Sequence, residues 1–252
     1  MAAESIELEQ APPRGNALIT RRLVWSLGAV ALGQALVVSA AALGAPAWLP
    51  GGAALQPAAL PGLLAGTAVA LALLLAPAWG EAAPAGETRG AFLIRAGFVG
   101  CWQAAACAYF LLIASRMTPV DAGGLTRASA SVGLCAMLAV LLAGCWPRAY
   151  PGVALFWAVG APMSAYLVAE LFRSTPPGYM GWSANPSAEA ATLRTWVDAL
   201  LRLSPGTAAV GQLEGQLPGG VPMGWTQVGV FGLAGGAVAF LALRFTPPRR
   251  AQ

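Results

Sequence analysis

Charged side chains are scarce in this sequence, so the few that cluster are the first candidates for chemistry. Only 10% of the chain is charged, yet the segment GETRGAFLIRAG holds Glu87, Arg89 and Arg95 within nine residues. We weigh two interpretations of this cluster. It is either the polar edge of a membrane segment, from which the Arg95 side chain extends to the headgroups, or a contact surface for another protein.

A second pair of opposite charges, Glu170 and Arg173, is separated by three positions. On a helix this spacing puts both side chains on one face. The pair is interpreted as an ion pair at the end of a helix, with a gate or substrate contact as the alternative.

The residues that usually carry catalysis or bind metals are missing or scattered. There is no His, which excludes His-ligated haem, the commonest zinc ligands and His acid–base chemistry. The four Cys form no CxxC pair and are interpreted as small buried residues. The sequence also lacks Walker A, GxSxG and HExxH motifs. We expect no enzyme activity, no metal and no cofactor in this chain.

The composition predicts that the elements holding these residues are membrane-spanning helices. The chain has 252 residues, of which 58% are hydrophobic, and its mean hydropathy is +0.67. A chain so apolar cannot cover its surface as a soluble globule, so we expect the bilayer to be its solvent. The net charge of +4 comes from Arg spread along the chain, which argues against nucleic-acid binding.

Intervals without charge indicate where the spans lie, because a charge in the middle of a bilayer is costly. Residues 23–80 contain no charge over 58 positions, room for two spans of about 20 residues each. Four shorter charge-free intervals follow, and each holds one helix. We therefore predict an all-α polytopic membrane protein with six spans, at 23–43, 60–78, 92–114, 129–146, 151–172 and 225–244.

The distribution of Arg predicts the orientation and the division of the chain. Eight Arg fall on the side of the two termini and five on the other, which favours cytoplasmic termini. We predict a cytoplasmic arm at 1–22, a transmembrane domain at 23–245 and a cytoplasmic tail at 246–252. The loop 173–224 would then be extracytoplasmic. Trp25, Trp48, Trp79, Trp146 and Trp225 lie near predicted span ends, where aromatic belts form.

Two short helices are predicted in that extracytoplasmic loop. The first, an amphipathic helix, follows Ser187 as its N-cap. The second begins with Ser204 as N-cap and Pro205 in its first turn.

Small and polar residues inside the spans predict helix packing. Gly232 and Gly236 form a GxxxG motif in the last span, and either pack against another helix of the chain or form a subunit interface. Gln34 and Gln103 are mid-span, and either hydrogen-bond between helices or line a pathway.

Three short motifs resemble the permeases of type-2 ABC exporters, the ABC-2 family. GETRGAF is similar to the charged cytoplasmic loop after the second span. LRLSPGTAAVGQL is similar to the short helices that dip into the outer leaflet before the last span. FLALRFTPPRR resembles the apolar helix with a basic end that closes members of the family.

The resemblance implies a permease subunit in a bacterial inner membrane, paired with a second permease subunit and driven by a separate ATP-binding cassette ATPase. On this hypothesis Glu87, Arg89 and Arg95 would meet the ATPase. The alternative is a structural or assembly subunit of a larger multisubunit membrane complex.

Overall fold

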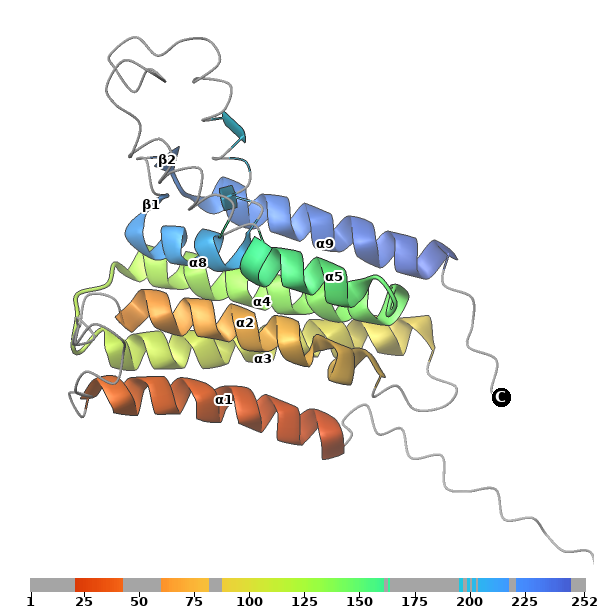
Figure 1. Cartoon of the computed structure of the whole chain (residues 1–252), viewed down its shortest axis with the longest axis horizontal. Coiled ribbons are helices and arrows are strands. Elements are labelled where there is room, and N and C mark those ends of the chain that lie inside the picture. The colour runs from red at the N-terminus through yellow and green to blue at the C-terminus, as the bar shows by residue number, and fades with distance from the viewer. Residues whose placement is uncertain are drawn as a thin grey trace, which may run out of the picture.

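The fold is a bundle of long apolar helices (Figure 1). The structure, a computed structural model, describes residues 21–42, 60–81, 88–160, 163, 195–196, 199, 201–202, 204–217 and 221–245. Within those residues five helices are long and apolar enough to cross a membrane. They are α1 (Arg21–Ala42), α2 (Leu60–Glu81), α3 (Arg89–Ala114), α4 (Ala122–Cys145) and α9 (Trp225–Phe245). They agree with five of the six predicted spans and are compatible with a multi-pass membrane protein.

The predicted fifth span is described only over its first part. It begins as α5 (Tyr150–Leu155) and continues as a π-helical turn, η2 (Phe156–Gly160). This apolar segment of 11 residues is too short to cross a bilayer. The remainder of the predicted span lies outside the described residues, so a sixth span stays a prediction.

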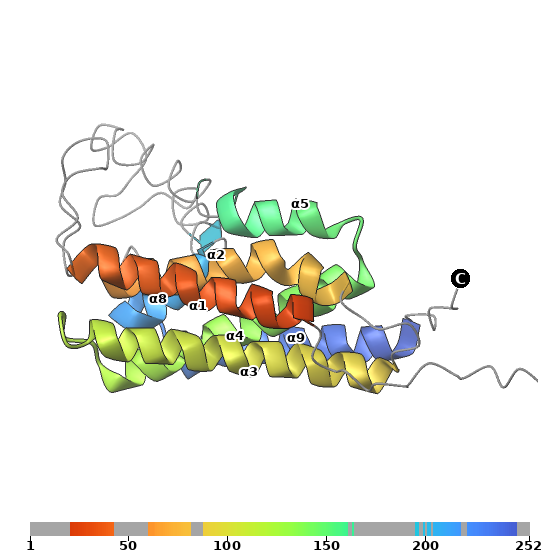
Figure 2. The same ribbon diagram turned by 90° about the horizontal axis from the view of Figure 1, so that it is seen from below.

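The first four long helices alternate in direction, and α9 runs in the same direction as α4 (Figures 1 and 2). Helices α1 and α3 begin at one end of the bundle, where α9 also ends; we call this the Arg89 end. Helices α4 and α9 begin at the opposite end, which we call the Ala122 end. The short helix α8 (Pro205–Glu214) lies beside α4 near the Ala122 end. It leads into a small hairpin of two antiparallel strands, β1 (Gln216–Leu217) and β2 (Val221–Pro222).

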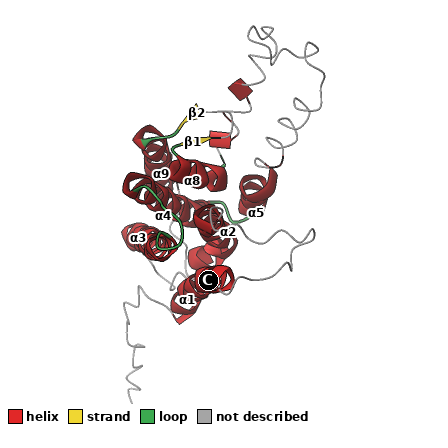
Figure 3. Cartoon of the chain, turned by 90° about the vertical axis from the view of Figure 1, so that its left-hand side faces the viewer, coloured by secondary structure: helices red, strands yellow, loops and turns green. Residues whose placement is uncertain are grey.

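Helix α4 lies at the centre of the bundle and contacts α2, α3, α8 and α9 (Figure 3). Its small residues explain this position, because they let neighbouring backbones approach closely. The closest approach is at α3: a Cβ placed on Gly133 would lie 2.7 Å from the Gly100 carbonyl oxygen. A Cβ on Gly124 would lie 3.0 Å from a carbonyl oxygen of α8.

The outer surface of the bundle is apolar. Large hydrophobic side chains on α1, α2, α3 and α9 are exposed in the isolated chain, among them Leu32, Leu36, Leu74, Leu112, Leu233 and Phe240. Such a surface suits lipid or another membrane helix as its surroundings.

Two helices begin earlier than the charge-free intervals predict. Helix α4 starts at Ala122 instead of residue 129, because Asp121 caps it by accepting a hydrogen bond from the Gly124 N–H at 2.8 Å. This places Arg127 inside the helix. Helix α3 starts at Arg89 instead of residue 92, with Thr88 as its N-cap. Local capping therefore extends both helices past their charged residues.

One of the tryptophans near a predicted span end does not face the outside of the bundle. Trp25, Trp146 and Trp225 are exposed, as a place in an aromatic belt requires. Trp79 is instead fully buried, and its indole N–H donates a hydrogen bond to the Ser26 hydroxyl on α1. The indole therefore joins α1 to α2, because its polar N–H finds a partner inside the bundle.

Candidate functional site

Arg89, from the charged cluster of the sequence, joins the start of α3 to the end of α9. Thr88 caps α3 by accepting the Ala91 N–H at 3.2 Å. The Arg89 guanidinium donates a hydrogen bond to the carbonyl oxygen of Leu243, in the last turn of α9. The last carbonyls of a helix lack partners within the helix and carry partial negative charge, so a cation is favoured there. Arg89 thus has a structural role within this chain.

Arg95 lies inside the bundle, and the expectation that it extends to the headgroups is wrong. Its side chain is 2% exposed. The guanidinium carbon lies 5.4 Å from the centre of the Phe92 ring, a cation–π distance. That ring packs against α4 at Gly144, where a Cβ would overlap it. A side chain enclosed in this way offers no surface to a soluble partner in this conformation.

The other predicted charged site residues, Glu87, Glu170 and Arg173, lie outside the described residues. Their roles as an ATPase contact, an ion pair or a gate therefore stay predictions.

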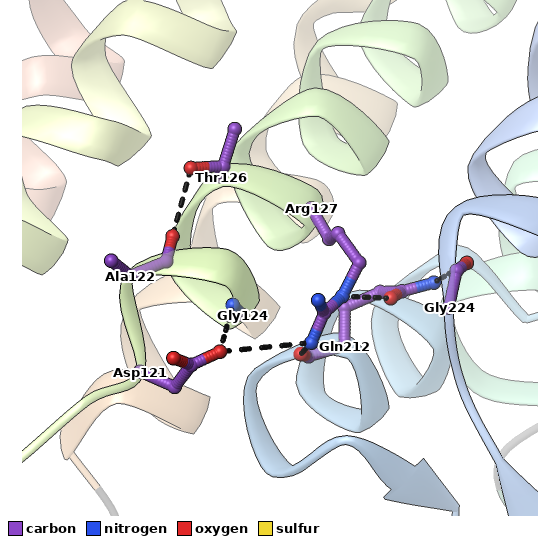
Figure 4. A network of polar contacts seen from close by, with 7 residues as sticks. All are labelled: Asp121, Ala122, Gly124, Thr126, Arg127, Gln212 and Gly224. Carbon is purple, nitrogen blue, oxygen red and sulfur yellow. Dashed lines mark hydrogen bonds and ion pairs between the residues drawn. The ribbon is translucent and has the colours of Figure 1, made fainter.

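A polar network that the sequence analysis did not find joins three elements at the Ala122 end (Figure 4). Arg127 of α4 donates through Nε to the Gln212 side-chain oxygen at 3.2 Å, and through Nη2 to the Gln212 carbonyl oxygen at 3.5 Å. The Gln212 amide donates in turn to the Gly224 carbonyl at 3.1 Å, just before α9. Gln212 is fully buried, so this exchange satisfies both ends of its amide inside the protein.

Asp121 contributes to the network mainly as a helix cap. One of its carboxylate oxygens lies 4.0 Å from the Arg127 guanidinium, but the Asp121 side chain is 72% exposed. An exposed ion pair at that distance contributes little stability. The sequence signal for the Asp121 capping bond is an Asp directly before the helix.

The network holds α8 in place between the long helices. The predicted second loop helix is confirmed as α8, with Pro205 in its first turn. Ser204 stands at the N-cap position, but its side chain makes no capping bond. At the other end Gly215 adopts a left-handed conformation, with φ of 72°, and its carbonyl accepts the Met223 N–H at 2.9 Å. The first loop helix lies mostly outside the described residues.

The GxxxG motif of α9 does not pack within the described bundle. A Cβ on Gly236 would meet nothing within 4 Å, and one on Gly232 would meet only the tip of Leu134, at 4.0 Å. The buried side of α9 is formed instead by Val228, Phe231 and Gly235. The packing of Gly232 and Gly236 against another helix of this chain is therefore not observed among the described residues.

The two mid-span glutamines are both buried, but they do not form the predicted interhelical hydrogen bonds. The side-chain amide atoms of Gln34 and Gln103 have no hydrogen-bond partner among the described residues. The sequence indicates that both side chains lie between helices, but it does not show whether hydrogen-bond partners for their amides lie nearby.

The described part of the chain offers positioning groups and no acid–base machinery. It contains no cluster of three or more residues able to hold a metal ion. No family model, no curated protein and no solved structure matches this chain. Functional inference therefore depends on the arrangement of the helices and on the resemblance of the motifs.

Proposed function

We propose that this chain is the membrane-spanning permease subunit of a type-2 ABC transporter in a bacterial inner membrane. It would move a substrate driven by a separate ATPase chain and would act with a second permease subunit. The Arg89 end, with both termini, would face the cytoplasm. The short helix α8 supports this proposal most. It stands at the same place in the chain as the short helices that dip into the outer leaflet in that family.

The placement of α8 is the observation that carries the proposal. It contacts both α2 and α4, and Ala208, Ala209 and Gln212 are buried. The carbonyl of Gln212 lies beside Gly124 in the first turn of α4. Pro205 is seven residues earlier on a helix that lies along α4, so it sits about 10 Å deeper in the bundle (Figure 1). Such a helix enters the membrane from one side without crossing it.

The link between α3 and α9 suggests how an ATPase would act on the bundle. Arg89 follows Glu87 by two residues and holds the last turn of α9 through the Leu243 carbonyl. A partner that moves this loop would shift the start of α3 and the end of α9 together. Such rigid-body movement of packed helices is a common form of transport transition.

The alternative is a structural or assembly subunit of a larger membrane complex. One observation favours it: Arg89 and Arg95 both interact with groups of this same chain, as a stabilising role requires. Under this alternative, integral partners would cover the exposed apolar faces and no ATPase would be needed.

Co-purification in a mild detergent, followed by charge reversal, tests the proposal. We expect an ATP-binding cassette ATPase to be recovered with the chain. We also expect Glu87→Arg to lower substrate-coupled ATP hydrolysis by about tenfold. In the proposed contact the Glu87 carboxylate attracts a basic group of the ATPase, and an arginine at this position would repel that group. Arg89→Gln, which keeps a donor for Leu243, separates loss of charge from loss of the α3–α9 link.

The matched control is Arg116→Glu, in the exposed turn at the other end of α3. It should leave coupling unchanged. Recovery of integral membrane partners without any ATPase would contradict the permease proposal and favour the structural one.

A further inference from the structure

We propose that Gln34 and Gln103 form a polar site in the middle of the bundle that water enters when α1 moves. The bundle described above would then be the closed state of this site. The inference deepens the proposed function. It rests on that function in one respect, the assignment of the hydrated site to a transport pathway within one chain.

A series of close contacts sets the level of α1 against that of α3. Trp79 of α2 bonds to Ser26 of α1. The next residue of α2, Gly80, lies against Gly144 of α4, where a Cβ would be 3.1 Å from the Gly144 nitrogen. Gly144 in turn lies against the Phe92 ring of α3. Ser26 and Phe92 therefore both lie in the half of the bundle nearer the Arg89 end.

The two glutamines lie farther along these helices by similar amounts. Gln34 is eight residues beyond Ser26, about 12 Å, and Gln103 is eleven residues beyond Phe92, about 17 Å. Because α1 and α3 run in the same direction and contact each other, both side chains lie in the middle part of the bundle. Both are near the middle of their helices, far from either bundle end.

Both amides are desolvated without compensation in the closed bundle. Gln34 and Gln103 are fully buried, and the nitrogen and oxygen of each amide have no partner among the described residues. A buried amide without a hydrogen bond costs free energy, and lipid offers no replacement for water. The third buried glutamine differs, because the Gln212 amide accepts from Arg127 at 3.2 Å and donates to the Gly224 carbonyl at 3.1 Å. Hydration would relieve the cost of burying the Gln34 and Gln103 amides.

Helix α1 is the element that can move to admit water. The α3–α4 contact is rigid, because the backbones touch at Gly100 and Gly133. By contrast, 22% of the α1 span is buried against 72% of the α4 span, and α1 lies at the edge of the bundle (Figure 3). A displacement of α1 therefore breaks fewer contacts per residue than a displacement of α4.

The chemistry of the site favours neutral hydrogen-bonding molecules, and water is the occupant we assign. A glutamine amide donates and accepts hydrogen bonds and carries no charge. The nearest charged residue on α3, Arg95, is eight residues from Gln103, about 12 Å along the axis. An ion would find no opposite charge on α3 at this depth.

Thiol labelling of the full chain in lipid nanodiscs tests the inference. Gln34→Cys and Gln103→Cys, made separately, would be treated with a small water-soluble methanethiosulfonate reagent, and each site quantified by mass spectrometry. The native Cys107 is the matched control, since it is buried on α3 one turn beyond Gln103. We expect both new thiols to be labelled at least about tenfold faster than Cys107. Labelling no faster than Cys107 would overturn the proposal.

A second reporter keeps both amides and covers the case in which a glutamine variant fails to fold. Val30→Cys lies one turn before Gln34 on the same face of α1 and is also buried. We expect it to be labelled faster than Cys107, and we expect adding Gln103→Met to slow its labelling about tenfold, because the amide that gains from hydration is then gone. Equal rates with and without Gln103→Met would refute a role for the amide.

The outcome is independent of the permease assignment. Labelling requires neither ATPase nor substrate, so a negative result removes the polar site and leaves the ATPase test intact. Conversely, labelled glutamine positions in a chain that recovers no ATPase would keep the hydrated site and remove its transport role.

Discussion

At the scale of single residues, hydrogen bonds from aromatic side chains join helices inside this bundle. The Trp79 indole reaches Ser26 of α1, and the Tyr150 hydroxyl reaches the Leu73 carbonyl of α2. Each side chain combines a large apolar body with one polar atom, so it can be buried when that atom finds a partner. Arg95 is accommodated in a related way, with its guanidinium over the Phe92 ring.

Tyr150→Phe should lower the free energy of unfolding by about 1 kcal/mol, because it removes one buried hydrogen bond and keeps the ring. Equilibrium unfolding in mixed micelles measures this loss. Tyr109→Phe is the control, since Tyr109 is 61% exposed and only its ring packs against Phe110. Equal effects of the two substitutions would show that the Leu73 bond adds no stability.

At the scale of elements, glycines determine which helices approach most closely. The α3–α4 crossing is the tightest, since Gly100 and Gly133 each lie against the carbonyl oxygen of the other. At the Ala122 end, Arg127 and Gln212 hold α8 beside α4. The capping residues Thr88 and Asp121 set where α3 and α4 begin. Packing and capping together position the elements that the hydropathy only outlines.

Gly100→Ala should destabilise the bundle by about 1–3 kcal/mol, because its methyl group would lie 2.8 Å from the Gly133 carbonyl oxygen and force α3 from α4. Gly97→Ala is the matched control on the same helix, where a Cβ meets nothing within 4 Å. We expect it to be neutral or slightly stabilising through helix propensity. Thermal unfolding in detergent compares them, and equal stability of both variants would argue against a close α3–α4 crossing.

At the scale of the whole molecule, one face of α9 has no partner among the described residues. Gly229 and Gly236 have open space beside them, and Leu233 and Phe240 are exposed. Such an apolar face suits lipid or another membrane helix as its surroundings. Of the two alternatives weighed for the GxxxG motif, packing against another helix of the chain is not observed among the described helices, and a subunit interface stays a prediction.

Gly236→Leu should leave the fold intact but weaken association of two chains, if α9 forms the proposed interface with a second permease subunit. The adjacent Gly235 is the matched control, because it is buried and a Cβ placed on it would lie 3.0 Å from the Met137 methyl carbon. Gly235→Leu should lower thermal stability, by about 1–3 kcal/mol. Native mass spectrometry and thermal unfolding separate the two effects. Unchanged oligomeric state in Gly236→Leu would exclude this face as the subunit contact.

The sequence by itself determined the all-helical class, the approximate ends of five long helices and the short helix after Ser204. Charge and apolarity suffice for this, because a span must be about 20 residues long and free of charge. The two early helix starts were missed because Asp121 and Thr88 act as caps, and a cap lets a helix include Arg127 or Arg89 near its end. Glu87, Glu170 and Arg173 stay at the level of prediction.

Only the tertiary structure decided which side of each helix faces inward. It put Arg95 and Trp79 in the interior, left the GxxxG motif on the surface, and joined Arg127 to Gln212 across 85 positions of sequence. A helix in a soluble protein reveals its buried face by a polar opposite face. A helix in a bilayer is apolar all round, so its sequence carries no such direction, and small residues and buried hydrogen bonds determine the packing.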